Sequence, residues 1–399
     1  MKNLLTSVCV FAACALGAAE PASFTDAIAQ GKVSINARLR YEGVQQTGLR
    51  DADAHTLRTR LGYTTAAWKG WKFMVEAENV TAVDGDSYSQ AGLNPGGAGK
   101  AVVADPESTE INQAFAAYTN GKTTVTLGRQ RLVLDNARFV GDVGWRQNQQ
   151  TFDAVSVQDK SFAKTTLTYA YLHQINRIFS DRHAQGDWAS DSHVLNAGYT
   201  GFAAGTLSAY TYLLDFDNSA PNSTATYGAS FSGAQKISGD TKVSYRLEGA
   251  TQSDYGSSTL NYRASYLALE AGLVLKQGGI ALGQERLGSD NNVGFKTPLA
   301  TLHAFNGWAD QFLGTPAAGL RDTYVKANAS LPGGVALLAF YHWYETDRTG
   351  VELGTEFNLQ ASRKFGKFVT ATAKYADFSR DSLSFPNVSK VWLQLEFVY

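Results

Sequence analysis

Apolar and polar residues alternate with a period of two along most of the chain. In the segment 33–41 the odd positions hold Val, Ile, Ala, Leu and Tyr, whereas the even positions hold Ser, Asn and two Arg. The same alternation recurs in 56–63, 242–248 and 391–399. A period of two is typical of β-strands with one apolar face, whereas a helix repeats after about 3.6 residues. The pattern therefore predicts a protein built almost entirely of strands.

The connections between these segments alternate in length. The short turns are 68–71, 120–122, 159–164, 201–205, 236–240, 276–279, 331–334 and 363–367. The longer connections are mostly rich in Gly, Asn and Asp and lie near 42–54, 81–110, 131–150, 174–192, 215–224, 251–258, 286–320, 345–350 and 379–387. Eight short and nine longer connections join 18 strands. An even strand number with short periplasmic turns and long outer loops is typical of outer-membrane barrels.

The predicted fold is all-β: a transmembrane antiparallel up-and-down β-barrel of about 18 strands. Closure of the barrel satisfies the backbone hydrogen bonds without an edge exposed to lipid. The apolar face of each strand then contacts lipid and the polar face lines a lumen. A soluble β-sandwich, propeller or β-helix is the alternative, but no blade or rung period is visible in the sequence.

Composition fits this fold once the two faces are considered separately. The chain has 399 residues, 18% of them charged, a net charge of −1 and a mean hydropathy of −0.21, which resemble values of soluble proteins. These values are averages over the apolar lipid-facing residues and the polar lumen-facing residues. Near-neutral charge argues against a nucleic-acid partner. Outside the N-terminus no apolar run is long enough for a membrane helix.

Residues 1–19 resemble a secretory signal peptide, with Lys2, an apolar stretch and the small residues 17–19. We expect its removal, which leaves a single barrel domain at 20–399. Both cysteines, Cys9 and Cys14, lie in the signal segment, so the mature chain would hold no disulfide or thiol site. A lipoprotein site at Cys14 and a short buried helix are the alternatives.

The final alternating segment ends on the aromatic Tyr399. It resembles the C-terminal signal read by the outer-membrane barrel assembly machinery, although a last strand can also end in Tyr by chance. The predicted location is the bacterial outer membrane, with lipid around the barrel.

Arginines are prominent on the polar faces and in one loop. By alternation, the lumen would receive Arg38, Arg40, Arg58, Arg60 and Arg246; the loop 131–150 and its flanks carry Arg129, Arg131, Arg138 and Arg146. A guanidinium recognises carboxylates through two parallel hydrogen bonds. The alternative is that neighbouring carboxylates neutralise these arginines: Glu76, Glu78, Glu248, Asp135 and Asp153.

Enzyme motifs are weak. The chain has no G-x-S-x-G or H-E-x-x-H motif and no metal-binding spacing among its six histidines. The Gly-rich stretch 96–100 lacks the first Gly and the Ser or Thr of a phosphate-binding loop. No cofactor is therefore expected, and a barrel hydrolase with a Ser–His pair is a minor alternative.

Two dense stretches carry a family resemblance: LGRQRLVLDNARFVGDVGWRQNQQTFDAV at 127–155 and GFKTPLATLHAFNGWADQF at 294–312. Both resemble the alginate-export family of outer-membrane β-barrels. The resemblance implies a monomeric barrel with an arginine-rich constriction that passes anionic polysaccharide. The short turn 363–367 stands where the family's founding exporter has a long periplasmic plug, which argues against gated export.

The resemblance also implies pore residues in both stretches. The first supplies Arg129, Arg131, Asp135, Arg138, Arg146, Gln147, Asn148 and Asp153, and the second His303, Asn306, Trp308 and Asp310. Trp145 and Trp308 could stack on sugars or only anchor the loops by packing. The expected function is a channel for anionic or polar solutes such as uronate oligosaccharides. A structural or adhesive barrel with a closed lumen is the main alternative.

Overall fold

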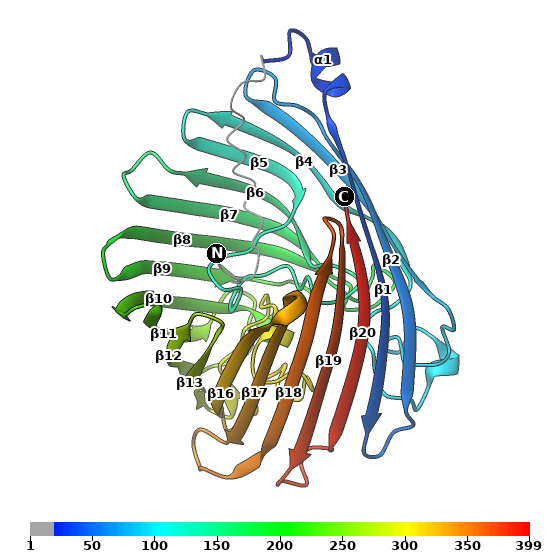
Figure 1. The fold of residues 1–399 in the computed structure, drawn as a ribbon, viewed down its shortest axis with the longest axis vertical. Helices are drawn as coiled ribbons and strands as arrows, with labels where there is room; N and C mark the ends of the chain where they lie inside the picture. Colours follow the sequence, from blue (N-terminus) through cyan, green and yellow to red (C-terminus); the bar gives the residue numbers. More distant parts are fainter. Residues whose placement is uncertain (1–19) are drawn as a thin grey trace.

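The computed structural model describes residues 20–399, in which 18 long strands form one antiparallel sheet (Figure 1). Each long strand pairs with the next along the chain, and β20 pairs with β1, so the sheet is closed. This confirms the predicted barrel and its strand number. The predicted signal peptide at 1–19 lies outside the described residues.

The long strands are bounded as follows: β1 (Lys32–Gln46), β2 (Ala52–Thr64), β3 (Trp71–Ala82), β4 (Ser108–Asn120), β5 (Thr123–Gln130), β6 (Thr151–Asp159), β7 (Thr165–Asn176), β8 (Asp187–Phe202), β9 (Gly205–Leu214), β10 (Thr224–Ser238), β11 (Thr241–Asp254), β12 (Arg263–Leu275), β13 (Gly278–Leu287), β16 (Leu320–Leu331), β17 (Val335–Glu345), β18 (Glu352–Phe365), β19 (Val369–Arg380) and β20 (Val388–Val398). The minor elements are α1 (Phe24–Ala29), a hairpin of β14 (Ser289–Asp290) and β15 (Val293–Gly294), and single turns of 3-10 helix: η1 (Pro95–Gly97), η2 (Ala220–Asn222), η3 (Leu302–Ala304) and η4 (Pro332–Gly334).

The turns occur where they were predicted, and several strands are longer than expected. β1 continues to Gln46 and β8 begins at Asp187, both inside stretches that were predicted as loops. The reason is continued pairing: the register between β1 and β20 extends to Gln46 opposite Val388. Polar residues in these extensions are compatible with strands that project beyond the bilayer.

Helix α1 lies at the end of the barrel that carries the short turns, as does the C-terminal end of β20 (Figure 1). Ser23 caps the helix by accepting a hydrogen bond from the Asp26 amide. Phe24 packs against Trp68 and Phe73, which anchors the helix to the turn between β2 and β3. Within residues 20–399, no helix is both long and apolar enough to cross a membrane.

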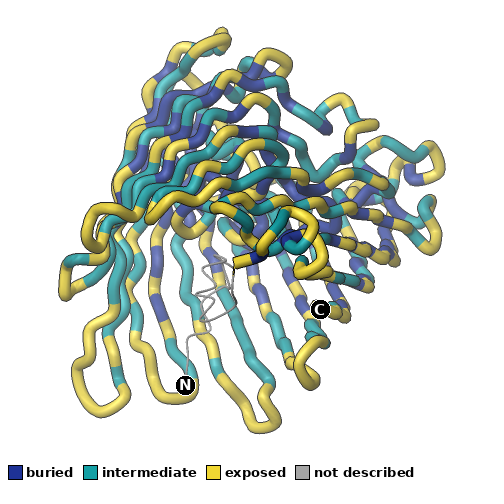
Figure 2. Tube along the Cα trace, turned by 90° about the horizontal axis from the view of Figure 1, so that it is seen from above, coloured by how far each residue is buried: buried dark blue, intermediate teal, exposed yellow. Residues whose placement is uncertain are grey.

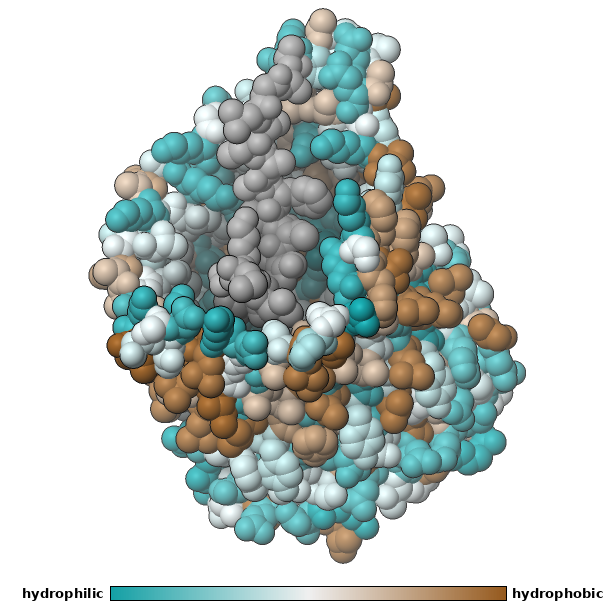
Figure 3. All heavy atoms as spheres, viewed as in Figure 1, coloured by the Kyte–Doolittle hydropathy of each residue, from teal (hydrophilic) through white to brown (hydrophobic). Residues whose placement is uncertain are grey.

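The two faces of the strands differ as predicted. Leu57 and Leu61 are exposed on the outside, while Arg58 and Arg60 between them are buried on the inside. Buried and exposed positions alternate along the strands in Figure 2. In Figure 3 hydrophobic residues gather on the side wall, between more hydrophilic ends. This arrangement suits a protein that is surrounded by lipid and polar inside.

Three long loops fold into the barrel and fill part of it: 83–107, 131–150 and 288–319. Their buried side chains include Tyr88, Val140 and Leu299. A backbone bridge between Val140 and Leu299 joins the second loop to the third. The interior core therefore lies between these loops and the strand wall.

Candidate functional site

The inner wall of β19, β20, β1 and β2 is strongly basic. These four adjacent strands direct six basic side chains inward: Arg38, Arg40, Arg58, Arg60, Lys374 and Lys390. On the same strands the inward carboxylates are Glu42 and Glu396. The β-strand alternation alone accounts for this placement, since all of these residues occupy even positions.

Arg38 and Arg58 lie directly opposite each other across β1 and β2. Like charges at such a position are destabilising unless a counter-charge lies between them. Glu396 of β20 fills this role, because its Oε1 is 3.0 Å from Arg38 Nη2 and 3.1 Å from Arg58 Nη2. Arg60 pairs with Glu78 of β3.

The loop 131–150 is attached to this wall. The Arg38 Nη1 donates to the main-chain oxygens of Gly144, Trp145 and Arg146 at 3.1–3.2 Å. Arg40 donates to the Trp145 oxygen at 2.6 Å and holds its guanidinium 4.2 Å from the centre of a Trp145 ring. The arginines therefore position the loop as well as charging the wall.

Arg146 of this loop forms ion pairs with two carboxylates. Its guanidinium lies 3.0 Å from Glu42 of β1 and 3.0 Å from Asp310 of the loop 288–319. These carboxylates and Asp105 raise the pKa of Arg146 above its ordinary value. Asp105 also pairs with Arg40 at 3.3 Å, so the loop 83–107 joins the same cluster.

His303 of the loop 288–319 connects Asp310 to Lys374. Its Nδ1 is 2.7 Å from Asp310 Oδ1, and its Nε2 is 2.6 Å from Lys374 Nζ. An ammonium group can only donate, so Nε2 accepts and the ring proton is on Nδ1. Burial and the nearby positive charge of Lys374 lower the pKa of His303 well below its usual value. A neutral imidazole with Nδ1 as donor and Nε2 as acceptor makes both of these contacts.

Lys374 is surrounded by tryptophans. Its Nζ is 3.7 Å from the ring centre of Trp308, 4.1 Å from that of Trp145 and 5.4 Å from that of Trp392. Among the described residues, no carboxylate lies within ion-pair distance of Lys374. The tryptophan rings stabilise the ammonium through cation–π attraction. Trp145 and Trp308 therefore have the packing role that was one of their two predicted interpretations.

We define the basic cluster as the seven basic groups Arg38, Arg40, Arg58, Arg60, Arg146, Lys374 and Lys390, with the five carboxylates Glu42, Glu78, Asp105, Asp310 and Glu396 that pair with them. The cluster therefore has two more basic groups than carboxylates. Two donors of Arg58, Nε and Nη1, and the Nε of Arg38 have no acceptor among the described residues. Such buried donors favour an anionic or polar partner.

Other predicted pore residues form separate ion pairs inside the barrel. Arg138 pairs with Glu285 at 2.6 Å and also donates to Asn306. Arg246 pairs with Asp135 and with Glu248 at 2.7 Å each.

Other predicted pore residues of the stretch 127–155 also form ion pairs or hydrogen bonds within the protein. Arg131 pairs with Asp142 of the same loop. Asn148 donates to the Pro106 oxygen, and Gln147 donates to the Thr56 hydroxyl. Arg246 is paired with Asp135 and Glu248, two of the carboxylates named in the alternative interpretation, whereas Arg131 and Arg138 are paired with Asp142 and Glu285, which were not predicted.

Arg129 and Asp153 lie elsewhere. They form a two-bonded pair at 2.7 and 3.0 Å across β5 and β6. Two residues along the strands, Leu127 and Val155 are exposed on the lipid-facing side, and regular alternation places Arg129 and Asp153 on that side too. This corrects the prediction that the pair lines the pore.

Several members of the basic cluster were not predicted. Lys374, Lys390 and Glu396 occupy even positions, and the alternation near the C-terminus already implied that Lys390 and Glu396 point inward. Asp105 comes from a loop, and no sequence pattern indicated that it would meet Arg40.

A family model described as alginate export matches residues 30–394. No curated protein matches the chain. Among solved structures, Pseudomonas aeruginosa OccK9 (OpdG) is 14% identical, with a TM-score of 0.73, 94% of this chain and 100% of that chain covered. Acinetobacter baumannii OccAB2 is 15% identical, with a TM-score of 0.75 and coverage of 94% and 98%. P. aeruginosa OpdK, solved with vanillate, is 14% identical, with a TM-score of 0.72 and coverage of 93% and 99%.

These similar structures are outer-membrane porins, and at this identity they show the fold. The family model covers most of the chain and shows the family. The chain therefore belongs to the alginate-export family and is a β-barrel protein of the bacterial outer membrane with the porin fold.

Proposed function

We propose that this barrel is a passive channel for anionic or polar solutes, such as uronate-containing oligosaccharides, and that the basic cluster determines its selectivity. The observation that carries the proposal is the excess of basic groups in the cluster together with the guanidinium donors of Arg58 that have no acceptor among the described residues. An anion that enters the barrel would find a favourable potential near this wall.

The size of the barrel supports a channel rather than a filled core. Barrels of 16–18 strands are wide enough for an aqueous passage, which inserted loops then narrow. In this chain three loops narrow the interior, and all three attach to the basic wall, through Arg38, Asp310 and Asp105. Selectivity in such a passage depends on the charge of the side chains that line it.

A mixture of paired and unpaired charges favours passage over tight binding. Conduction needs sites that attract a solute but release it. The carboxylates of the cluster weaken the attraction of the arginines, so an anion would be held weakly. OpdK, which shares the fold, was solved with vanillate, a carboxylate and so a member of the proposed solute class.

We further propose that the barrel stands alone as a monomer and that the strand ending at Tyr399 is the segment read by the assembly machinery. Both proposals follow from the family resemblance and from the position of β20, whose pairing with β1 closes the barrel.

Ion selectivity in planar bilayers tests the channel. Purified barrel should give stepwise conductance, and Arg58→Gln should reduce the preference for chloride over potassium. Arg321→Gln, on the outer face and paired with Glu345, is the matched control and should leave the preference unchanged. Oligouronates should block the wild-type channel. A silent bilayer would instead support a structural or adhesive barrel.

A further inference from the structure

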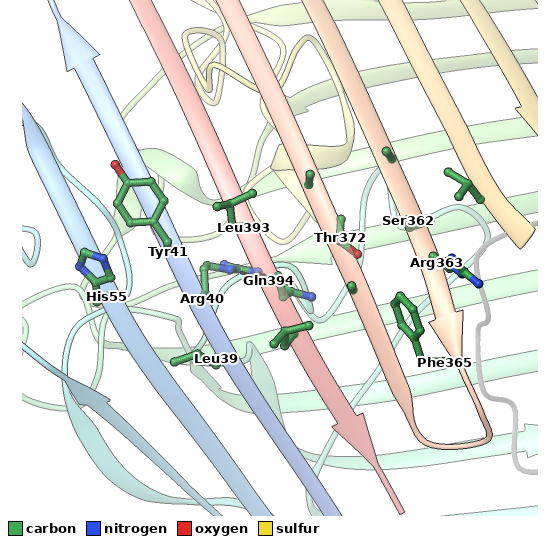
Figure 4. A pocket seen from close by; sticks show the side chains of 15 residues that line it. Leu39, Arg40, Tyr41, His55, Ser362, Arg363, Phe365, Thr372, Leu393 and Gln394 are labelled. Atoms are coloured by element: carbon green, nitrogen blue, oxygen red, sulfur yellow. Dashed lines mark hydrogen bonds between the residues drawn. The ribbon is translucent and has the colours of Figure 1, made fainter. Parts of the chain in front are cut away.

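The lipid-facing wall carries an apolar groove of about 530 Å³ over β17 to β20, β1 and β2 (Figure 4). Its outward-facing lining residues are Leu39, Tyr41, His55, Val335, Ala361, Arg363, Phe365, Ala371, Ala373, Leu393 and Leu395. Only one of these residues, Arg363, carries a permanent charge.

The pairing of the strands explains the groove. Ala371 of β19 lies between Leu395 and Arg363, its partners on either side. In the next row, Ala373 lies between Leu393 and Ala361. The alanines thus form a floor of small side chains beside a ridge of leucines.

The groove rises through the membrane. Arg363 is close to the periplasmic end of β18, whereas His55 is close to the opposite end of β2. The path from β18 to β2 crosses four strand spacings of about 4.8 Å, or roughly 19 Å. That distance is similar to the length of an extended fatty acyl chain.

Arg363 is an unusual residue for this surface. It is exposed, alternates with the lipid-facing Ala361 and Phe365, and holds its guanidinium 4.8 Å from the centre of the Phe365 ring. Among the described residues it has no carboxylate within ion-pair distance. Lys367 of the following turn is exposed as well, and it too has no such partner in the described part of the chain.

Charge complementarity identifies the occupant. A cation on a lipid-facing surface is tolerated near the membrane interface, where its side chain can reach the headgroups. Basic residues beside a bilayer attract anionic lipid. Here two basic residues, Arg363 and Lys367, stand at the periplasmic end of an apolar groove that has the length of an acyl chain.

We propose that this groove binds one anionic phospholipid of the periplasmic leaflet. The phosphate pairs with the guanidinium of Arg363, assisted by Lys367, and one acyl chain lies over Ala371 and Ala373. The site faces the membrane and is separate from the basic cluster, so it does not depend on the solute that the channel carries.

Native mass spectrometry of the full barrel, incubated in detergent with dioleoylphosphatidylglycerol, tests the site. The wild type should retain one lipid per barrel. Arg363→Gln should lower the retained fraction at least fivefold, and Arg363→Lys should restore part of it. Ala371→Leu should lower it by filling the groove.

Two matched controls should retain lipid like the wild type. Lys276→Gln removes a basic residue from another periplasmic turn, and Ala197→Leu enlarges a residue on the wall at β8. Heat-modifiable migration in gels confirms that each variant is folded. The proposal would be overturned if all variants retained lipid equally, or if Lys276→Gln lost as much lipid as Arg363→Gln. It would also be overturned if the wild type formed a dimer without bound lipid.

Discussion

Arg38 and Arg58 face each other across β1 and β2, and one carboxylate, Glu396, pairs with both. The side chain of Arg58 is fully buried and that of Arg38 nearly so. A buried pair of like charges is stable only while its shared partner is ionised. The charge of this wall, and with it the proposed selectivity, therefore depends on Glu396.

Removal of that carboxylate should increase anion preference. Glu396→Gln leaves Arg38 and Arg58 without their shared counter-charge, so the wall becomes more positive. Bilayer reversal potentials should shift toward the value of a more anion-selective channel. The same change should destabilise the barrel by about 3–5 kcal/mol, because it leaves buried charges unpaired. Urea titration of heat-modifiable mobility measures this loss.

The control for this experiment is Glu352→Gln, which changes an exposed carboxylate at the start of β18. It should alter neither the bilayer reversal potential nor the stability measured by urea titration. A shift toward cation preference in Glu396→Gln would contradict the assignment of this wall as the selective surface.

The two loop arginines of the family stretch should behave differently. Arg146 lies in the basic cluster, whereas Arg129 lies on the outer face with Asp153. Arg146→Ala should therefore lower the anion preference, and Arg129→Ala should leave it unchanged. Reversal potentials of the two single variants under one salt gradient make the comparison. An equal effect of both would show that the face assigned to Arg129 is wrong.

Lys374 should hold the two inserted loops against the wall. Its ammonium contacts Trp145 of one loop and Trp308 of the other, and a desolvated cation–π contact contributes about 2 kcal/mol. Lys374→Ala should increase the hydrogen exchange of 131–150 and 295–312. The strand amides of β8 to β11, on a distant part of the wall, serve as the internal control. Unchanged exchange in the loops would refute this role.

Acid should loosen the same contact through His303. Its pKa in the folded protein lies well below the ordinary value of 6.5, so the unfolded chain binds the proton first as the pH falls. Stability is therefore complete above about pH 6.5 and decreases below it, by up to about 1.4 kcal/mol per pH unit, until His303 itself is protonated.

Urea titrations at a series of pH values measure this dependence. His303→Gln should flatten the curve below pH 6.5, and His55→Gln, on the outer face, should not. If His303→Gln leaves the slope unchanged, another group is responsible.

Much of the fold could be predicted because barrel strands follow a strict alternation. The positions of the turns and the inward direction of Arg38 and Arg58 follow from that period. Arg129 shows where a family resemblance was less informative than alternation: Leu127, two residues earlier, already indicated the outer face. The family stretch identified Arg146, but it did not separate it from Arg129.

The partners of the arginines could not be predicted in the same way. Asp105 meets Arg40, and His303 meets Lys374, only because long loops return into the barrel. The path of such a loop depends on many contacts distant in sequence, and no local period encodes it. The groove beside Arg363 depends on the register of six strands, which the alternation alone does not determine.

The reversal potential of the wild-type channel in a planar bilayer under a potassium chloride gradient tests the central claim most directly. The basic cluster predicts a potential whose sign corresponds to chloride permeating faster than potassium. A potential of the opposite sign, or a value that Arg58→Gln and Glu396→Gln both leave unchanged, would contradict the account.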